Sequence, residues 1–334
     1  MLTKITVLLL WTTLLIAGCN SKQESTPQPA NRAALQKVTI SYGGPLPSLL
    51  AIAADQDFFT REGLDVTIKD CILGKSALEE MLAGKSDYAV HAETPLVVKS
   101  FARNDFLIIA SLGTTDNLNS IVTRGDRGIK SVVDLKGRRV ATAQGTLPHY
   151  FLDLLLAKNG LNEKDIVPLF MGPDKLESAL LDGRVDAIST TTNNSRKALI
   201  KLGNKGGLIE ESGLCLANSI FTTSKKNISA NPDQVGKILR ALRAAERFLQ
   251  QNPGKSREIV MTSLNLSQMD YNTVWAKYTD RLALDEVLLL MLEEQAAWVM
   301  QKGTVAQQQI PNYLDFIDAG HLQKAAPEAV RLKR

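Results

Sequence analysis

Residues that could carry out catalysis are few and scattered in this chain. The three histidines stand far apart, at His91, His149 and His321. Neither the Gly-x-Ser-x-Gly turn of serine hydrolases nor the His-Glu-x-x-His pair of zinc proteases occurs. Gly-Lys-Ser occurs three times, but each time without the glycine five residues earlier that a phosphate-binding P-loop needs. The sequence therefore favours neither an enzyme nor a site for a cofactor or metal.

Residues suited to ligand binding gather in loops where a strand-like run leads into a helix. Ligands of open α/β sheets bind at the carboxyl ends of strands. A helix N-terminus adds free N–H groups and the positive end of the helix dipole. Four such junctions occur, at Gly43–Pro47, Gly74–Ser76, Glu93–Pro95 and Gly145–His149. They predict a binding site for a small polar or anionic molecule.

The clearest junction is the one at Gly145 and Thr146. Gly145 lets the backbone approach a ligand closely, and Thr146 is a suitable N-cap for the helix that follows. His149 falls off the apolar stripe of that helix, so it is either a ligand contact or a residue of the first turn. Glu93 either accepts hydrogen bonds from a ligand or is a solvated acid favoured by the helix dipole. Lys75 is either an anion clamp or a surface lysine.

The elements that must position these loops alternate along the chain from Lys37 onward. Short apolar runs and helical patterns follow one another, which indicates an α/β fold with largely parallel sheets. Strands are expected at 37–41, 64–68, 87–90, 139–143, 165–170, 185–189 and 220–224. Helices are expected at 46–59, 76–84, 147–159, 174–183, 233–251 and 286–303. Ser76 with Glu79, and Asp174 with Glu177, have the spacing of a capping box at two helix starts.

Two stretches of the chain repeat each other in order and in detail. "MLAGKSDYAV" at 81–90 matches "LLDGRVDAIS" at 180–189, and "GPLPSLL" at 44–50 matches "GTLPHYF" at 145–151. The two matches have the same offset, about one hundred residues, to within two positions. The pattern predicts two similarly built lobes.

The chain is expected to pass between the lobes twice. The connecting segments are predicted near 121–124 and near 218–222, and the chain beyond the strand at 220–224 reads as nearly all helical. Lobe 1 is therefore expected to comprise residues 37–122 and 220–334, and lobe 2 residues 123–219. A length of 334 residues agrees with two domains.

The N-terminus has the composition of a secretory signal. Lys4 precedes an apolar run too short to span a bilayer comfortably, and the run ends in the small-residue sequence Ile16-Ala17-Gly18-Cys19. This ending resembles the bacterial lipobox, in which the cysteine receives fatty acyl chains such as palmitate and becomes the first mature residue. We expect a signal peptide at 1–18, a lipidated Cys19, and a flexible tether at 19–36. The alternative is an ordinary signal peptide with an incidental cysteine.

Charge and cysteine content restrict the partners. Lys plus Arg number 39 and Asp plus Glu 35, an excess too small and too dispersed for a nucleic-acid-binding protein. With Cys19 lipidated, Cys71 and Cys215 remain. A disulfide is possible in an exported protein, but the two cysteines fall in different predicted lobes, so we expect two buried free thiols.

A family resemblance rests on several of these stretches together. The chain resembles the solute-binding proteins of ABC importers of the nitrate/sulfonate/taurine (THI5/NMT1-like) type. The similarity is carried by "FFTREGLDV" (58–66), "SDYAV" (86–90), "GIKSVVDLKGRRVATAQGT" (128–146) and "LDGRVDAIS" (181–189). It implies a type II periplasmic-binding fold, in which two lobes joined by a two-segment hinge close on a ligand.

The resemblance also implies which loops contact the ligand: the loop after the first strand, the one at Thr94, and the one at Gly145 and Thr146. Together with the junctions above, the predicted binding residues are Gly43, Gly44, Pro45, Gly74, Lys75, Ser76, Glu93, Thr94, Gly145, Thr146, His149, Thr191, Thr192 and Asn193. The chain departs from many relatives at 190–194, where "TTTNN" replaces an expected Trp-x-Pro. Asp57 and Glu93 also stand where smaller residues are usual in relatives.

The function implied is that of a monomeric, lipid-anchored binding protein that delivers a small polar solute to an ABC permease and its ATPase. Sulfonate, nitrate, an aminopyrimidine or another small acid would suit a site built from loops and helix dipoles. Two alternatives stay open. One is a ligand-sensing lipoprotein that signals to a partner. The other is a pyrimidine-biosynthesis enzyme of the same fold, whose cysteine-rich motif this chain lacks.

Overall fold

The computed structural model describes residues 34–334 except 274, 304, 307–308 and 334. The expected signal peptide, the lipidation site Cys19 and most of the expected tether lie outside the described residues. In the described part, no helix combines the length and apolar character needed to cross a membrane.

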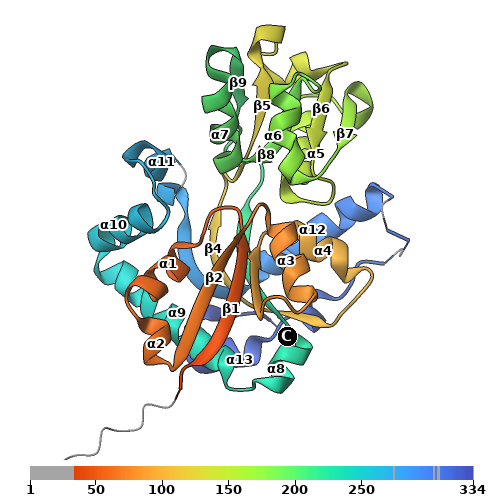
Figure 1. The fold of residues 1–334 in the computed structure, drawn as a ribbon. Coiled ribbons are helices and arrows are strands. Elements are labelled where there is room, and N and C mark those ends of the chain that lie inside the picture. Colours follow the sequence, from red (N-terminus) through yellow and green to blue (C-terminus); the bar gives the residue numbers. More distant parts are fainter. Residues whose placement is uncertain (1–33, 274, 304, 307–308, 334) are drawn as a thin grey trace, which may run out of the picture. The chain divides into compact units, whose positions relative to one another are not determined.

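The described strands form two mixed sheets (Figure 1). The first has seven strands in the order β12-β11-β4-β10-β3-β1-β2. Its strands are β1 (Gln36–Gly43), β2 (Leu64–Cys71), β3 (Tyr88–His91), β4 (Phe106–Thr115), β10 (Ala217–Ser224), β11 (Thr279–Asp285) and β12 (Val330–Arg331). β1 runs parallel to β2 and β3, whereas β10 is antiparallel to β3 and β4, and β11 is antiparallel to β4.

The second sheet has five strands in the order β7-β6-β8-β5-β9. Its strands are β5 (Asn119–Arg124), β6 (Arg139–Thr142), β7 (Val167–Phe170), β8 (Ala187–Thr191) and β9 (Gly206–Ile209). β6 is parallel to β7 and β8, and β5 is antiparallel to β8 and β9. The antiparallel strands in both sheets correct the expectation of largely parallel sheets, while the α/β class is confirmed.

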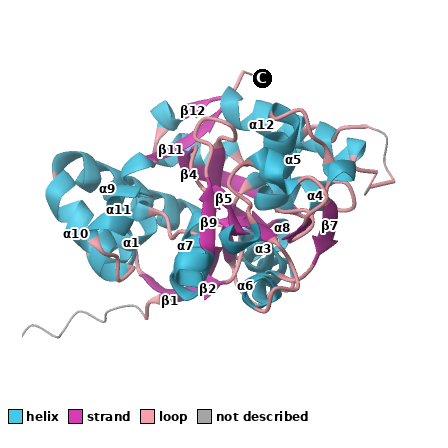
Figure 2. Cartoon of the chain, turned by 90° about the horizontal axis from the view of Figure 1, so that it is seen from above, coloured by secondary structure: helices cyan, strands magenta, loops and turns pink. Residues whose placement is uncertain are grey.

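Helices cover the sheets, as Figure 1 and the view from above in Figure 2 show. The α-helices are α1 (Ser48–Asp55), α2 (Phe58–Arg61), α3 (Gly74–Leu82), α4 (Glu93–Ser100), α5 (Leu147–Lys158), α6 (Pro173–Leu181), α7 (Thr192–Leu202), α8 (Lys225–Ala230), α9 (Gln234–Gln251), α10 (Pro253–Ser263), α11 (Gln268–Thr273), α12 (Glu286–Gln301) and α13 (Ala319–Ala325). Short 3-10 turns include η1 (Gly125–Arg127) and η3 (Glu163–Asp165).

The chain passes twice between the two sheets. It leaves the first sheet after β4 and enters the second at β5, through residues 116–118, and it returns between β9 and β10, through residues 210–216. β5 belongs to the second sheet from Asn119 onward, and β10 to the first sheet from Ala217 onward. The lobe limits at 122/123 and 219/220 stay a prediction.

Each sheet has its own hydrophobic core. One large cluster packs on the first sheet and includes Ile40, Phe106 and Phe221. On the second sheet, Ile121 belongs to one cluster and its neighbour Val122 to another. Because successive residues of a strand point to opposite faces, these two clusters lie on opposite faces of the sheet. Apolar burial on both faces explains why its strands read as continuous apolar runs rather than as alternating ones.

The internal repeat has a structural counterpart. In the first sheet, the Asp87 carboxylate accepts a hydrogen bond from the Thr39 N–H at 2.8 Å, and the Asp87 N–H donates to the Thr39 carbonyl at 2.9 Å. In the second sheet, Asp186 and Arg139 make the same pair of bonds, at 2.9 and 2.8 Å. The aspartate shared by the two sequence matches therefore fastens the same pair of neighbouring strands in each sheet.

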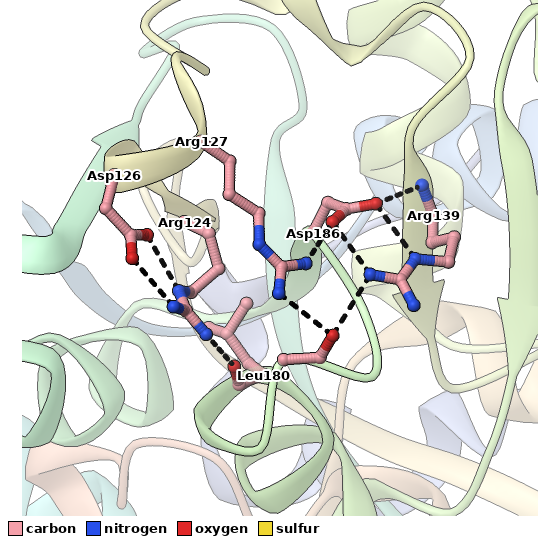
Figure 3. Close-up of polar contacts among 7 residues, drawn as sticks. Arg124, Asp126, Arg127, Arg139, Leu180 and Asp186 are labelled. Carbon is pink, nitrogen blue, oxygen red and sulfur yellow. Dashed lines mark hydrogen bonds and ion pairs between the residues drawn. The ribbon is translucent and has the colours of Figure 1, made fainter.

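Around Asp186 the second sheet adds two arginines (Figure 3). The guanidinium groups of Arg127 and Arg139 both pair with the Asp186 carboxylate, and both donate to the Gly183 carbonyl. The hydrogen bonds from Arg139 hold the pKa of Asp186 far below its ordinary value. Asp186 immediately precedes β8, whereas Thr191 ends it. This ion cluster therefore fastens the end of the sheet opposite to the one where the sequence predicts ligand contacts.

Several expected details are wrong for local reasons. The helix expected at 46–59 is interrupted, because Asp57 adopts a left-handed conformation with φ of 55°. The two expected capping boxes are absent, since α3 already begins at Gly74 and α6 begins at Pro173. The region beyond 224 is not nearly all helical, because it contains β11 and β12. Both cysteines are free as expected, but Cys71 is only partly buried.

Candidate ligand-binding site

A small, partly open crevice lies where loops of the two sheets meet. Its volume is about 40 Å³, room for one or two water molecules. It is lined by Gly43, Gly44, Pro45, Leu73, Gly74, Lys75, Val90, His91, Ala92, Pro95, Leu118, Asn119, Thr146, Leu147, Pro148, Thr191, Asn218, Ser219 and Tyr278. Since these residues come from the strands and loops of both sheets, a ligand of several atoms enters only when the two sides separate.

Half of the residues that the sequence predicts for binding meet in this crevice. The loop after β1 and the start of α3 contribute residues from the side of the first sheet. The N-cap of α5 and the end of β8 contribute residues from the side of the second sheet. Together, the residues from the two sides are Gly43, Gly44, Pro45, Gly74, Lys75, Thr146 and Thr191. The two halves of the sequence repeat therefore face each other across one site.

The other predicted residues lie outside the crevice lining. Gly145 and His149 border a neighbouring cavity together with Trp298 and Lys302. Asn193 borders a polar groove on the other side of Gly44 and Pro45. The remaining residues lie within or at the starts of helices and are Ser76, Glu93, Thr94 and Thr192. Of these, the Thr94 hydroxyl donates to Gln295 and the Thr192 hydroxyl donates to the Asn117 carbonyl.

Two glycines of the crevice permit an unusually close approach of the backbone. A Cβ atom added at Gly43 would lie 2.1 Å from the carbonyl carbon of Leu73, and one at Gly74 would lie 2.7 Å from the Cβ of His91. Both distances are far below van der Waals contact. The end of β1, the start of α3 and the end of β3 can therefore converge only because both positions are glycine.

Three crevice residues carry buried polar atoms without a partner. Among the described residues, neither Nδ2 nor Oδ1 of Asn119, nor the hydroxyls of Thr191 and Tyr278, make a hydrogen bond. Asn119 and Thr191 are each only 5% exposed. Buried polar groups in proteins are nearly always hydrogen-bonded, so unpaired ones point to strain or to function. Here all of these unpaired atoms belong to the lining of one crevice.

His91 also lines the crevice, but its ring is fully engaged. Nε2 lies 2.9 Å from the Thr222 hydroxyl, and Nδ1 lies 2.7 Å from the Ala92 carbonyl. Nδ1 must therefore carry the proton, because a carbonyl can only accept. Burial lowers the pKa of His91 to about 4. The residue is thus a neutral structural support at neutral pH.

The charge at the crevice is weakly positive. Among the described residues that line it no carboxylate occurs, and Lys75 supplies the formal charge. The Lys75 ammonium lies 3.5 Å from the Gln144 carbonyl, so this side chain extends from the start of α3 to the loop that precedes α5. The N-terminal ends of α3, α4 and α5 reach the lining as well, and their dipoles favour a negative or electron-rich group.

Glu93 differs from both alternatives that the sequence offered, because it is not a solvated acid and does not line the crevice. Its side chain is wholly buried, and neither carboxylate oxygen has a hydrogen-bond partner of good geometry among the described residues. Burial raises the pKa of Glu93 to about 8, opposed in part by the backbone N–H groups of Glu93 and Asn218. The carboxyl is therefore largely neutral at pH 7 and does not repel an anion in the crevice.

His149 belongs to a polar cluster that joins α5 to α12. Trp298 donates from Nε1 to Asp153 at 2.7 Å, and the Lys302 ammonium pairs with Asp153 at 2.9 Å and also with Glu163. The His149 ring packs edge-on against Trp298, with centroids 5.0 Å apart. α12 packs on the first sheet's helix α4 and α5 packs on the second sheet, and Figures 1 and 2 show the two helices side by side. The cluster thus links the two sides of the crevice.

The same cluster has the residue types of a metal site but not the right donors. His149, Asp153 and Glu163 bring possible ligand atoms within 4.8 Å of one another. However, the Gly145 N–H donates to Nδ1 of His149, so the neutral ring carries its proton on Nε2. Burial lowers the pKa of His149 to about 4, which keeps the ring neutral. With Lys302 already neutralising both carboxylates, the donor set does not favour a metal ion.

Sequence reasoning missed the residues of the connecting segments. Asn119 follows the first crossing between the sheets, and Asn218 and Ser219 follow the second. The sequence predicted the two connections between the lobes near these positions. The polar residues beside the predicted connections were therefore the signal that could have identified them as binding residues. Tyr278 had no such signal, because the chain around it reads as helical.

Comparison with known proteins agrees with this geometry. Residues 48–256 match the family model described as "NMT1/THI5 like". The chain belongs to this family. The sequence resemblance to solute-binding proteins of the nitrate/sulfonate/taurine type is thereby confirmed.

Individual relatives agree with the family. A Bacillus subtilis (strain 168) protein named "Putative aliphatic sulfonates-binding protein" is 24% identical over 321 residues, 94% of each chain. The alkanesulfonate-binding protein SsuA from Xanthomonas axonopodis pv. citri, solved with MOPS bound, has a TM-score of 0.72 at 21% identity, covering 86% of this chain and 100% of SsuA. The desulfurization enzyme DSZB has a TM-score of 0.60 at 14% identity, covering 87% of this chain and 99% of DSZB. These structures show that the fold is that of the periplasmic binding proteins.

Proposed function

We propose that this NMT1/THI5-like protein is an extracytoplasmic solute-binding lipoprotein. It captures a small polar or anionic solute between its two sides and delivers the solute to an ABC importer. The observation that carries the proposal is the crevice between the sheets, where Asn119, Thr191 and Tyr278 hold buried polar atoms with no partner among the described residues. A solute that satisfies these groups from both sides stabilises the closed arrangement, and its differential affinity shifts the equilibrium toward it.

The ligand classes under this proposal are sulfonates, nitrate, taurine-like molecules and aminopyrimidines. The helix N-termini and Lys75 favour a negative or electron-rich group at the crevice. The protonated state of Glu93 at neutral pH removes a carboxylate that would oppose such a group. The residues proposed to contact the solute are the predicted ones that line the crevice, with Asn119, Asn218, Ser219 and Tyr278 added to them.

The proposed partners are an ABC permease and its ATPase, with the protein acting as a monomer. The "IAGC" sequence ending at Cys19 supports a lipid anchor that holds the body outside the cytoplasm. The proposed location is the periplasmic face of a bacterial membrane, or the outer face of the cell membrane in a cell with a single membrane. Labelling cells with a radioactive or clickable palmitate tests the anchor. The wild-type chain should incorporate label and sediment with membranes, whereas Cys19→Ala should do neither. Equal labelling of both chains would contradict a lipid anchor at Cys19.

An enzymatic role is the weaker alternative, although the fold is shared with DSZB. Neither Cys71 nor Cys215 lines the crevice. Burial raises the pKa of the Cys215 thiol to about 12, which removes the thiolate that a nucleophile requires. A ligand-sensing lipoprotein without a transporter would use the same crevice, so binding alone does not separate it from an importer component.

Two experiments test the proposed function. A thermal-shift panel of sulfonates, nitrate, amino acids and pyrimidines should raise the melting temperature for at least one class, because a ligand that binds only the native state stabilises it. Failure of every class at concentrations well above micromolar would contradict a solute-binding role. Uptake of the identified solute in cells lacking the protein then separates transport from sensing, since only transport predicts reduced uptake.

A further inference from the structure

We infer that the ligand presents a hydrogen-bond donor beside an acceptor on one edge, as a carboxamide does. This deepens the proposed function and rests on it. The inference starts from Asn119, whose side-chain amide lies at the crevice with both Nδ2 and Oδ1 unpartnered among the described residues. A side-chain amide offers two donors and one accepting oxygen, so complete satisfaction requires both kinds of group from the ligand.

Neighbouring side chains in the described part of the protein do not supply the missing partners of Asn119. The side-chain amide oxygen Oδ1 of Asn218 already accepts from the Ser111 hydroxyl, and the Thr146 hydroxyl donates to the main-chain carbonyl of Ala143 at 2.6 Å. The His91 ring is engaged at both nitrogens. Of the buried side-chain atoms that line the crevice in the described chain, those left unpaired belong to Asn119, Thr191 and Tyr278.

Oxyanions can form hydrogen bonds with only some of the unpaired atoms of Asn119, Thr191 and Tyr278. A nitrate or sulfonate oxygen can accept from Nδ2 of Asn119 and from the hydroxyls of Thr191 and Tyr278. It cannot donate to Oδ1 of Asn119, so that oxygen would stay buried and unpaired, which is costly. A site built to hydrogen-bond a ligand group discriminates strongly against analogues that lack the group.

Ammonium groups fail for a different reason. An ammonium group, such as the one that taurine carries at the end away from its sulfonate, can donate to Oδ1 of Asn119 but offers no acceptor beside that donor for Nδ2. No carboxylate lines the crevice in the described residues to balance its charge, and an unpaired charge is expensive to bury. A neutral carboxamide carries its N–H and C=O side by side at the spacing of the Asn119 amide, and can form two parallel hydrogen bonds with it.

The test uses two series of compounds that keep the anionic group and change only the other end. The sulfonate series is sulfoacetamide, sulfoacetate, 2-methylpropane-1-sulfonate and taurine. The carboxylate series is malonamate, malonate, 3-methylbutanoate and β-alanine. Dissociation constants are measured by calorimetry on the wild-type chain. In at least one series we expect the carboxamide to bind about tenfold or more tightly than its three analogues.

Two variants of Asn119 decide whether this residue causes the preference. Asn119→Leu should bring the affinity ratio between the carboxamide and its apolar analogue close to one. Asn119→Asp, which keeps the size and adds a negative charge, should transfer the preference to the amine of the same series. Asn159→Leu, at the far end of α5, is a matched control and should leave the ratio unchanged. Melting temperatures of the unliganded variants verify folding.

The outcomes separate this inference from the proposed function. If sulfonates or carboxylates bind without any carboxamide preference, the solute-binding function stands and the inference is overturned. It is also overturned if the preference persists in Asn119→Leu. If no compound of either series and no solute of the wider panel binds, the proposed function fails as well.

Discussion

Asn119 and Thr191 lie directly opposite each other in the antiparallel pairing of β5 with β8. Residues paired in this way project from the same face of a sheet, with Cβ atoms about 5 Å apart. Both side chains are nearly wholly buried, and their polar atoms have no partner in the described chain. A single ligand group can therefore contact both residues, which makes this pair the centre of the second sheet's contribution to the crevice.

Thr191→Val should separate binding from stability. The substitution removes an unpaired buried hydroxyl, so we expect the free energy of unfolding of the unliganded protein to stay the same or rise, by up to about 3 kcal/mol. Ligand affinity should fall several-fold, because the hydroxyl no longer reaches the ligand. Urea unfolding and calorimetry measure the two quantities.

Thr123→Val is the matched control for that change. Thr123 lies near the other end of β5, and its hydroxyl donates to the Ile129 carbonyl at 3.2 Å. Here stability should fall by about 1 kcal/mol while affinity is retained. If Thr191→Val lowers stability as Thr123→Val does, the Thr191 hydroxyl has a structural partner and the assignment is wrong.

Gly43→Ala should disrupt the crevice from the first sheet. The added Cβ would overlap the backbone of Leu73, so the junction must shift. We expect stability to fall by about 1–3 kcal/mol and ligand affinity to fall at least tenfold. Gly254→Ala in α10 meets no atom within 4 Å, and it should leave stability unchanged or raise it by about 0.5–1 kcal/mol. Equal stability of both variants would contradict the close approach at Gly43.

Glu93 predicts a specific dependence of stability on pH. Its pKa in the folded protein is about 8, against an ordinary value of 4.5. Between these two pH values the folded chain holds a proton that the unfolded chain has released, so this group lowers stability as pH rises through the window. Glu93→Gln does not titrate. The stability of Glu93→Gln relative to wild type should therefore increase from pH 5 to pH 8, by more than about 1 kcal/mol. A difference that is constant with pH would show that Glu93 is ionised in the folded state.

The cluster at Lys302 should influence closure without touching the ligand. Lys302→Ala leaves Asp153 and Glu163 without their cation, and we expect a loss of stability of up to about 3 kcal/mol. Because these contacts link α12 to α5 across the crevice, ligand affinity should fall several-fold through faster dissociation. Lys175→Ala, an exposed lysine of α6, should change neither quantity. If the ligand dissociates from Lys302→Ala at the same rate as from the wild type, the cluster does not stabilise the closed arrangement.

Local signals in the sequence were sufficient to predict most of the strands and helices that position the site. Apolar runs and glycine stops located strands such as β1 and β6, and the repeat around Asp87 and Asp186 reflects a real pair of backbone hydrogen bonds. The loops at Gly43 and Thr146 meet because corresponding junctions of the two sheets face one another. Strand limits depend on neighbours in sequence, and the facing of the two loops follows from the internal repeat, so a single sequence displays both signals.

The rest of the site depends on contacts between distant residues. Asn119 faces Thr191 only through the register of β5 with β8. Tyr278 reaches the crevice because β11, which follows it, pairs with β4 through an irregular antiparallel register. The apolar residues around β11 are equally compatible with a helix, so periodicity alone could not assign them. The burial of Glu93 likewise depends on α12, about two hundred residues away, whose Gln295 receives the hydrogen bond of the adjacent Thr94.

The central claim is that a small solute binds in the crevice between the two sheets. Calorimetric titration of the wild-type chain and of Asn119→Leu, with the best solute from the panel, tests it most directly. The account predicts one saturable site in the wild type and a loss of affinity of at least about tenfold in the variant, with the melting temperature of the unliganded variant maintained. Absence of binding to the wild-type chain, or identical affinities in the two proteins, would contradict it.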